Sequence, residues 1–141
     1  MNLRLAFGIF IRLLVVFYVL LWMVGGITTS IMMGGNILDP DFIQKKNSIV
    51  LTTTAALLWL CAAASPAFIK NVTAAEKLPI KAGRWLLIMR VSATSLVAAA
   101  VALHIIYRLS LSAWIAAKML APLLIAASIA VAFSAKYQPD T

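Results

Sequence analysis

Four long apolar runs, separated by short polar connections, dominate the chain. They cover residues 13–33, 49–69, 85–107 and 113–135. Each run has about 20 residues, enough for a helix that rises about 1.5 Å per residue to cross a hydrocarbon core of roughly 30 Å. Because lipid offers no partners to backbone N–H and C=O groups, such runs are expected to be helical. The pattern predicts an all-α fold, an integral membrane four-helix bundle that residues 1–141 form as a single domain.

The first dozen residues precede the first apolar run and place Arg4, Gly8 and Arg12 on one helical face. Such a segment can lie in the headgroup zone before the chain turns into the membrane. A cleavable signal peptide is the alternative for this end. The apolar run is longer than a typical h-region, and no small-x-small cleavage site closes it before polar sequence begins. We therefore expect the first span to be retained.

The second helix has a clear start signal. Asp39 followed by Pro40 supplies a carboxylate at the N-cap and a proline at the first helical position. We expect a short surface turn of helix over residues 41–47 before the second span begins. Within that span, the hydroxyls of Thr52–Thr54 are expected to bond back to carbonyls of their own helix.

The distribution of lysine and arginine among the connections predicts the orientation. One side carries Arg4, Arg12, Lys70, Lys77, Lys81, Arg84 and Lys136, and the other carries Lys45, Lys46 and Arg108. The positive-inside rule then places both termini in the cytoplasm of a multi-pass protein of the bacterial inner membrane. Trp85 and Trp114 are expected at the two opposite membrane interfaces, where aromatic residues are enriched.

Composition supports this class and excludes others. Hydrophobic residues make up 64% of the chain and charged residues 11%, which is incompatible with an ordinary soluble domain. The formal net charge of +8 could suggest nucleic acid, but the cations sit at the ends of apolar runs rather than on a solvated face. Anionic lipid headgroups account for them, so we expect the lipid bilayer and no nucleic acid as a partner.

Two cations lie inside the apolar runs, and one of them begins a polar line. At about 100° per residue, Arg90, Thr94, His104 and Arg108 fall within about 40° of a single line along the third span. Lys118 lies in the fourth span. A charge in the membrane core costs at least about 2.5–3.5 kcal/mol, so Arg90, Thr94, His104 and Lys118 are predicted to contact a ligand or a partner. The alternative is that both cations reach towards opposite interfaces.

The apolar runs contain no Asp or Glu. A drug/proton antiporter is therefore disfavoured, because proton coupling usually depends on a titrating carboxylate in the membrane. The counter-group of Arg90 must then be a backbone carbonyl, a lipid phosphate, an anionic ligand or a carboxylate of another chain. No nucleophile–base pair, phosphate-binding loop or Cys/His cluster occurs, so no catalytic residue, metal site or cofactor is predicted. His104 alone is a poor site for metal or haem.

The second half of the chain resembles a known group of small membrane proteins. The segments are RVSATSLVAAAVAL from Arg90 and SAWIAAKMLAPLLIAASIAVAF from Ser112, with LWMVGG in the first span. The first two segments, within residues 84–135, are similar to the arginine-led and lysine-bearing spans of the copper-resistance D-type membrane domain. The four-helix membrane protoporphyrinogen oxidases share a comparable arrangement, and LWMVGG resembles their W-x-G-G segment. The resemblance implies a haem- or copper-handling scaffold. Those families carry histidines in the first span, and this chain has none before His104, so their activity is not transferred.

These features favour a non-enzymatic subunit or accessory factor of a larger membrane assembly. Small residues in the last two spans, and Gly26 with Ser30 in the first, predict close helix contacts within the bundle, with a membrane-protein partner or in a homo-oligomer. One alternative is a carrier or channel for an anionic or metal species, with Arg90, Thr94, His104 and Lys118 along its path. Others are a haem- or copper-handling protein and an immunity protein against a pore-forming toxin.

Overall fold

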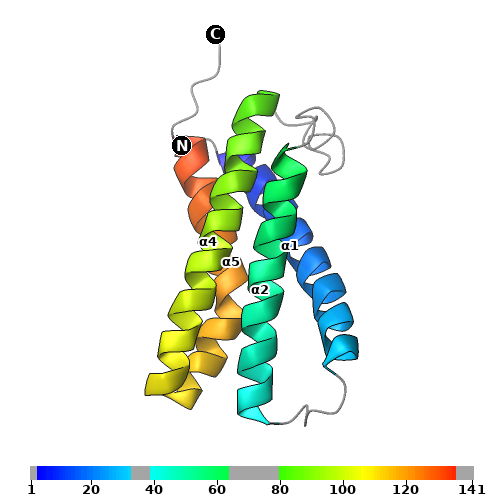
Figure 1. Ribbon diagram of the computed structural model, residues 1–141. Coiled ribbons are helices and arrows are strands. Elements are labelled where there is room, and N and C mark those ends of the chain that lie inside the picture. The colour runs from blue at the N-terminus through cyan, green and yellow to red at the C-terminus, as the bar shows by residue number, and fades with distance from the viewer. Residues whose placement is uncertain (1–2, 33–38, 64–79, 136–141) are drawn as a thin grey trace.

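The computed structural model describes residues 3–32, 39–63 and 80–135, and this part of the chain is all-helical. It contains four helices: α1 (Leu3–Ile31), α2 (Pro40–Ala63), α4 (Ala82–Leu109) and α5 (Leu111–Ala135) (Figure 1). Three of them, α1, α4 and α5, are long and apolar enough to cross a membrane. The prediction of helices in all four apolar runs is thus confirmed for the described residues. The end of the second predicted span, beyond Ala63, lies outside them.

Two helices start earlier than the apolar runs suggest. In α1 the first turns continue into the span as one helix, and Leu5 and Ile9 are buried in the core, so the first dozen residues are not a separate segment. In α2 a single helix begins at Pro40, without a break between the predicted surface turn and the span. The predicted N-cap is confirmed, because the Asp41 N–H donates to the Asp39 carboxylate at 3.1 Å.

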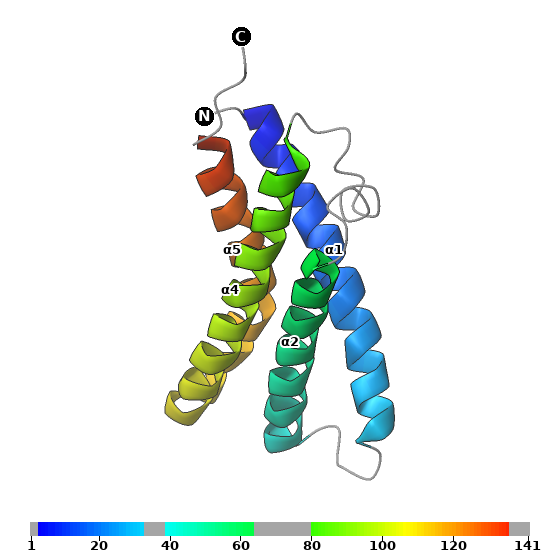
Figure 2. The ribbon, with the colours of Figure 1, turned by 45° about the horizontal axis from the view of Figure 1, so that its top comes forward.

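The four helices lie side by side with a simple up-and-down path (Figure 2). We call the end where α1 and α4 begin, and α2 and α5 end, the termini end, and the opposite end the turn end. At the turn end Ser110 alone separates α4 from α5, and its hydroxyl accepts a hydrogen bond from the Ala113 N–H at 3.3 Å. The most extensive contact is between α2 and α4. Helix α5 packs against both α1 and α4, and α1 also packs against α2.

One apolar core joins all four helices. Helix α1 contributes residues at intervals of four, which the helical period places on one face. The core members of α1 are Leu5, Ile9, Leu13 and Phe17; those of α2 are Leu51, Ala55 and Leu58; those of α4 include Ile88, Met89, Leu96 and Leu103; and those of α5 include Ala126, Ile129 and Ala130. Thr54 is fully buried beside them, and its hydroxyl has no hydrogen-bond partner among the described residues. The expected bond to the helix carbonyls is present at Thr52, which donates to Ser48 O at 2.7 Å, but not at Thr54.

The two tryptophans expected at the interfaces are both inside the protein. Trp85 has no exposed surface and belongs to the core cluster, and Trp114 is also buried. Trp85 lies three residues before Ile88 and four before Met89, so it falls on the core-facing side of α4. The two rings therefore pack inside the protein near opposite ends of the bundle, and their expected depth at the two membrane interfaces stays a prediction.

Replacing Trp85 by alanine should destabilise the protein by about 3–5 kcal/mol, since a fully buried aromatic side chain leaves a cavity. The matched control is Trp22→Ala in α1, where the ring is 80% exposed and its removal leaves the core intact. Reversible unfolding in detergent micelles, followed by circular dichroism, measures both changes. Equal losses of stability in the two variants would contradict the placement of Trp85.

Candidate functional site

The polar line of the third span lies on the outside of α4. Arg90 is half-buried, whereas Thr94, His104 and Arg108 are exposed, as are the residues between them on the same face. The core-facing side of α4 is the opposite one, with Ile88, Ala93 and Leu96 among its members. The line therefore lies away from the apolar core of the bundle.

Arg90 has a partner that sequence reasoning did not consider. Its guanidinium carbon lies 5.5 Å from the ring centroid of Trp59 in α2, a cation–π contact that joins the two helices. The Arg90 Nε is buried and has no hydrogen-bond partner among the described residues. The only signal for this contact was an aromatic residue in a neighbouring apolar run, and no sequence pattern shows that it meets Arg90.

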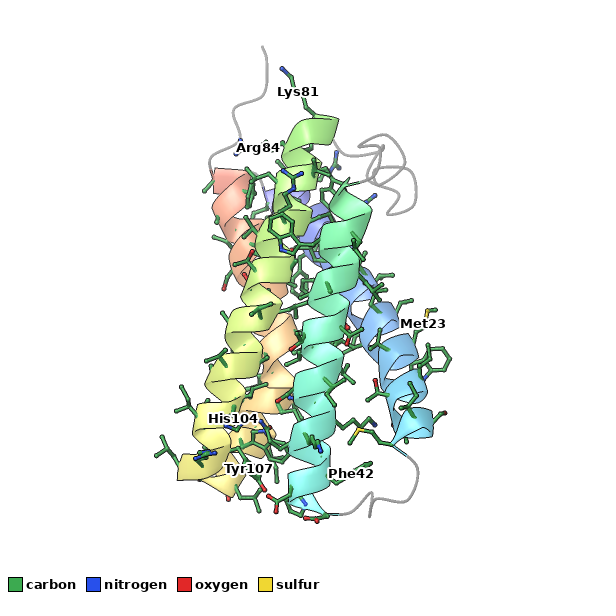
Figure 3. The ribbon with its side chains drawn as sticks, in the orientation of Figure 1. Met23, Phe42, Lys81, Arg84, His104 and Tyr107 are labelled. Carbon is green, nitrogen blue, oxygen red and sulfur yellow. The ribbon has the colours of Figure 1, made fainter. Side chains whose placement is uncertain are left out.

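A comparable contact lies nearer the start of α4. The Arg84 guanidinium lies 5.4 Å from the ring centroid of Phe133, and thereby joins α4 to α5 at the termini end (Figure 3). Two arginines of one helix thus hold two different neighbouring helices. Arg84 provides a natural comparison for any experiment on Arg90.

At the turn end an aromatic ladder connects three helices. The Tyr107 hydroxyl of α4 donates to the Asp41 carboxylate of α2. The Tyr107 ring meets the Trp114 ring of α5 edge to face, with centroids 5.1 Å apart and planes at 69°. The Lys118 ammonium lies 5.4 Å from the Trp114 ring centroid. These four groups, Asp41, Tyr107, Trp114 and Lys118, form a continuous series from a carboxylate to a cation.

His104 lies one turn from this ladder, and its partner is an amide (Figure 3). The Gln44 Nε2 lies 3.5 Å from His104 Nδ1 and also donates to Ser48 Oγ at 3.3 Å. Accepting at Nδ1 places the proton of a neutral imidazole on Nε2. Gln44 itself is buried, and its Oε1 has no hydrogen-bond partner in the described part of the chain. Within residues 3–32, 39–63 and 80–135, no group of three or more His, Cys, Asp or Glu side chains could hold a metal ion.

A pocket of about 600 Å³ opens between α1, α2 and α5 in the half of the molecule near the turn end. Its polar lining consists of Tyr18 from α1, Lys46 and Asn47 from α2, and Lys118 from α5. Its apolar lining consists of Leu21, Trp22, Gly25, Phe42, Ile43, Val50, Leu51, Leu103, Met119, Ala121 and Pro122. The Asn47 Nδ2 is buried and unpartnered among the described residues. Pro122 has no N–H to bond the Lys118 carbonyl, which loosens the helix at the pocket wall.

Sequence reasoning selected Lys118 but missed Lys46 and Asn47. The sequence places Lys46 in the predicted surface turn of helix over residues 41–47, where it counts only in the comparison of charge between the two sides. No local pattern indicates that residues 46 and 118 line the same pocket, because the fold alone brings α2 and α5 to it.

The four predicted contact residues fall at two places. Arg90 and Thr94 lie in the half of α4 towards the termini end, whereas His104 and Lys118 lie near the turn end. About 25 Å of helical rise separates Arg90 from Tyr107, the residue that leads through Trp114 to Lys118. The fold therefore does not gather these four side chains into one site.

Comparison of the chain with protein-family models, with curated proteins and with solved structures found no match. The similarity of residues 84–135 to the copper-resistance D-type domain thus stays a prediction from the sequence.

A double-mutant cycle should detect the contact between Arg90 and Trp59. Arg90→Gln and Trp59→Leu are expected to show a coupling of about 0.5–2 kcal/mol in unfolding free energy, the range of cation–π contacts. Arg90→Gln combined with Trp22→Leu serves as the control, and its effects should be additive because Trp22 lines the pocket in α1. Additive effects in both pairs would show that the ring does not hold the guanidinium.

Proposed function

We propose that this protein is a non-enzymatic subunit or accessory factor of a larger membrane assembly, and that it docks its partner on the outer surface of α4 around Arg90. The carrying observation is Arg90 itself, a half-buried cation that packs on the Trp59 ring in a chain whose apolar runs contain no carboxylate. We call Trp59, Arg90 and Thr94 the docking surface. The proposal includes a four-helix bundle in the bacterial inner membrane, with both termini in the cytoplasm.

The energetics of Arg90 support an acceptor supplied by another chain. A cation–π contact contributes about 0.5–2 kcal/mol. Insertion of an arginine into the membrane core costs at least about 2.5–3.5 kcal/mol. Since the contact with Trp59 falls short of that cost, a further stabilising group is needed. A carboxylate of a partner would accept two parallel hydrogen bonds from the guanidinium fork.

The lack of carboxylates in the apolar runs favours a different protein, rather than a second copy of this chain, as that partner. The apolar runs of this chain contain no Asp or Glu, so a second copy in the same orientation offers no carboxylate at the depth of Arg90. Thr94 uses its own proton to bond the Arg90 carbonyl at 3.0 Å, which leaves its oxygen free to accept a hydrogen bond from the partner.

The outer faces of α1 and α4 differ in side-chain size. Between Arg90 and His104 the exposed residues of α4 are small or β-branched: Thr94, Val97, Ala98, Val101 and Ala102. The exposed residues of α1 include larger ones, such as Phe7, Trp22 and Met23, together with Gly26 and Ser30. Small side chains let helix backbones approach closely, which is how helices associate in lipid. The contrast favours lipid around α1 and a partner helix along α4.

A carrier of an anionic species is the second candidate, and the lysines of the pocket favour it. Lys46 and Lys118 line one pocket together with an unpartnered amide. A single polar path through Arg90, Thr94, His104 and Lys118 has less support, because these residues lie in two separate halves of the molecule. A haem- or copper-handling role would use His104 Nε2, the ring nitrogen that Gln44 leaves free.

Substitution of Arg90 tests the docking surface. The tagged full-length chain, extracted in mild detergent, should recover a defined partner, and Arg90→Gln should lower that recovery by about tenfold or more, since the loss of one member of a buried ion pair is costly. Arg84→Gln is the matched control, because it removes the same charge from the same helix and also breaks a cation–π contact. Quantitative mass spectrometry of the eluates measures the change.

Site-specific photo-crosslinking gives an independent readout. A crosslinker at Val97 of α4 should capture the same partner, whereas one at Phe7 of α1 should label lipid. The proposal fails if wild-type protein is a monomer by native mass spectrometry, or if Arg84→Gln and Arg90→Gln lower recovery equally. Haem absorbance or stoichiometric copper in the purified protein would instead favour the cofactor-handling alternative.

A further inference from the structure

The pocket between α1, α2 and α5 is separate from the docking surface and has its own chemistry. Two half-buried cations, Lys46 and Lys118, reach it from different helices. Its lining contains no carboxylate, and the Asn47 Nδ2 is buried there as a donor without an acceptor. Two ammonium groups that share an apolar pocket repel each other, and an anion bound between them would remove that repulsion.

The remaining lining is apolar, and this determines the kind of anion. Leu21, Trp22 and Met119 would contact water if the pocket held only a small inorganic ion. An amphiphile instead covers them with its hydrocarbon part, and burial of apolar surface contributes about 25 cal/mol per Å². The pocket opens sideways, because Trp22 and Met119 at its edge are 80% and 71% exposed.

The depth of the cations matches a lipid headgroup. Lys46 lies in the second turn of α2 and Lys118 in the second turn of α5, about 9 Å and about 10.5 Å from the starts of their helices at the turn end. A phosphate held there lies at the border between headgroups and hydrocarbon, with its chains directed towards the middle of the membrane. Trp114 supports this position, since its ring holds the Lys118 ammonium at 5.4 Å.

From this geometry we infer that the pocket is a binding site for the phosphate of an anionic membrane lipid. Lys46 and Lys118 pair with the phosphate oxygens. The acyl part lies along the apolar wall formed by α1 and by α5 around Pro122. This lipid site is separate from the docking surface and shares no residue with it.

Lipid retention by the purified full-length protein tests the site. The protein is reconstituted in phosphatidylcholine nanodiscs that contain phosphatidylglycerol, re-extracted in mild detergent and analysed by native mass spectrometry. Wild-type protein should retain phosphatidylglycerol in preference to phosphatidylcholine. Lys46→Gln and Lys118→Gln should each lower that preference by about fivefold, the contribution of one lysine near an anionic headgroup.

Matched variants separate binding from folding and from general charge. Lys45→Gln removes the same charge from an exposed neighbouring position on α2 and should leave retention unchanged. Lys118→Arg keeps the charge and should retain the lipid, so a loss confined to Lys118→Gln is not a folding defect. Arg90→Gln should also leave retention unchanged, which keeps a failure of this site distinct from a failure of partner docking.

Competition with inorganic phosphate distinguishes a lipid phosphate from free phosphate as the ligand of the pocket. An excess of free phosphate should not displace the retained lipid, because it lacks the apolar part. Binding of inorganic phosphate with the same lysine dependence, but without lipid retention, would overturn the assignment to a lipid. Equal retention of both lipids by wild-type protein, or equal losses in Lys45→Gln and Lys46→Gln, would overturn it as well.

Discussion

The pairing of cations with aromatic rings is the interaction on which the polar groups of this protein depend. Arg84 lies over Phe133, Arg90 over Trp59 and Lys118 over Trp114. The apolar runs contain no carboxylate, so a ring face is one of the polarised surfaces, beside backbone carbonyls, that the apolar segments themselves can offer a cation. Two of these contacts also join neighbouring helices, and the third continues the ladder that links α5 to α4 and α2. The rings hold these charges in place without neutralising them.

Incomplete neutralisation gives the two ends of the molecule different properties. Towards the termini end, Arg90 has a ring on one side and an unpartnered Nε, beside a helix face of small residues. Near the turn end, Lys118 shares a pocket with Lys46 and an unpartnered amide of Asn47. The first arrangement suits a carboxylate carried by a helix, and the second suits a phosphate with an apolar tail. About 25 Å of helix separates Arg90 from Tyr107, which leads to Lys118. Substitutions in one arrangement are therefore expected to leave the other unchanged.

The apolar core makes this division possible. Helix α1 contributes one face of residues spaced by four, and α4 contributes the facing side with Trp85 at its start. Hydroxyl groups inside the helices bond mostly to carbonyls of their own helix, as Ser92 does to Ile88 O at 2.8 Å and Thr28 to Val24 O at 2.7 Å. Hydrogen bonds between side chains of different helices occur at the turn end, where Tyr107 meets Asp41 and Gln44 meets His104.

The sequence by itself determined the helices, the start of α2 at Asp39 and Pro40, and the unusual positions of Arg90 and Lys118. These follow from local causes: backbone hydrogen bonding, run length and capping act within a few residues of one another. Only the tertiary structure decided that Trp85 is in the core, that Trp59 meets Arg90 and that Lys46 and Lys118 share a pocket. Helical periodicity states which residues share a face, but it does not state which face meets which helix. That choice depends on side-chain packing between segments far apart in the chain. It places Arg90 against Trp59, and Lys118 in a pocket with Lys46.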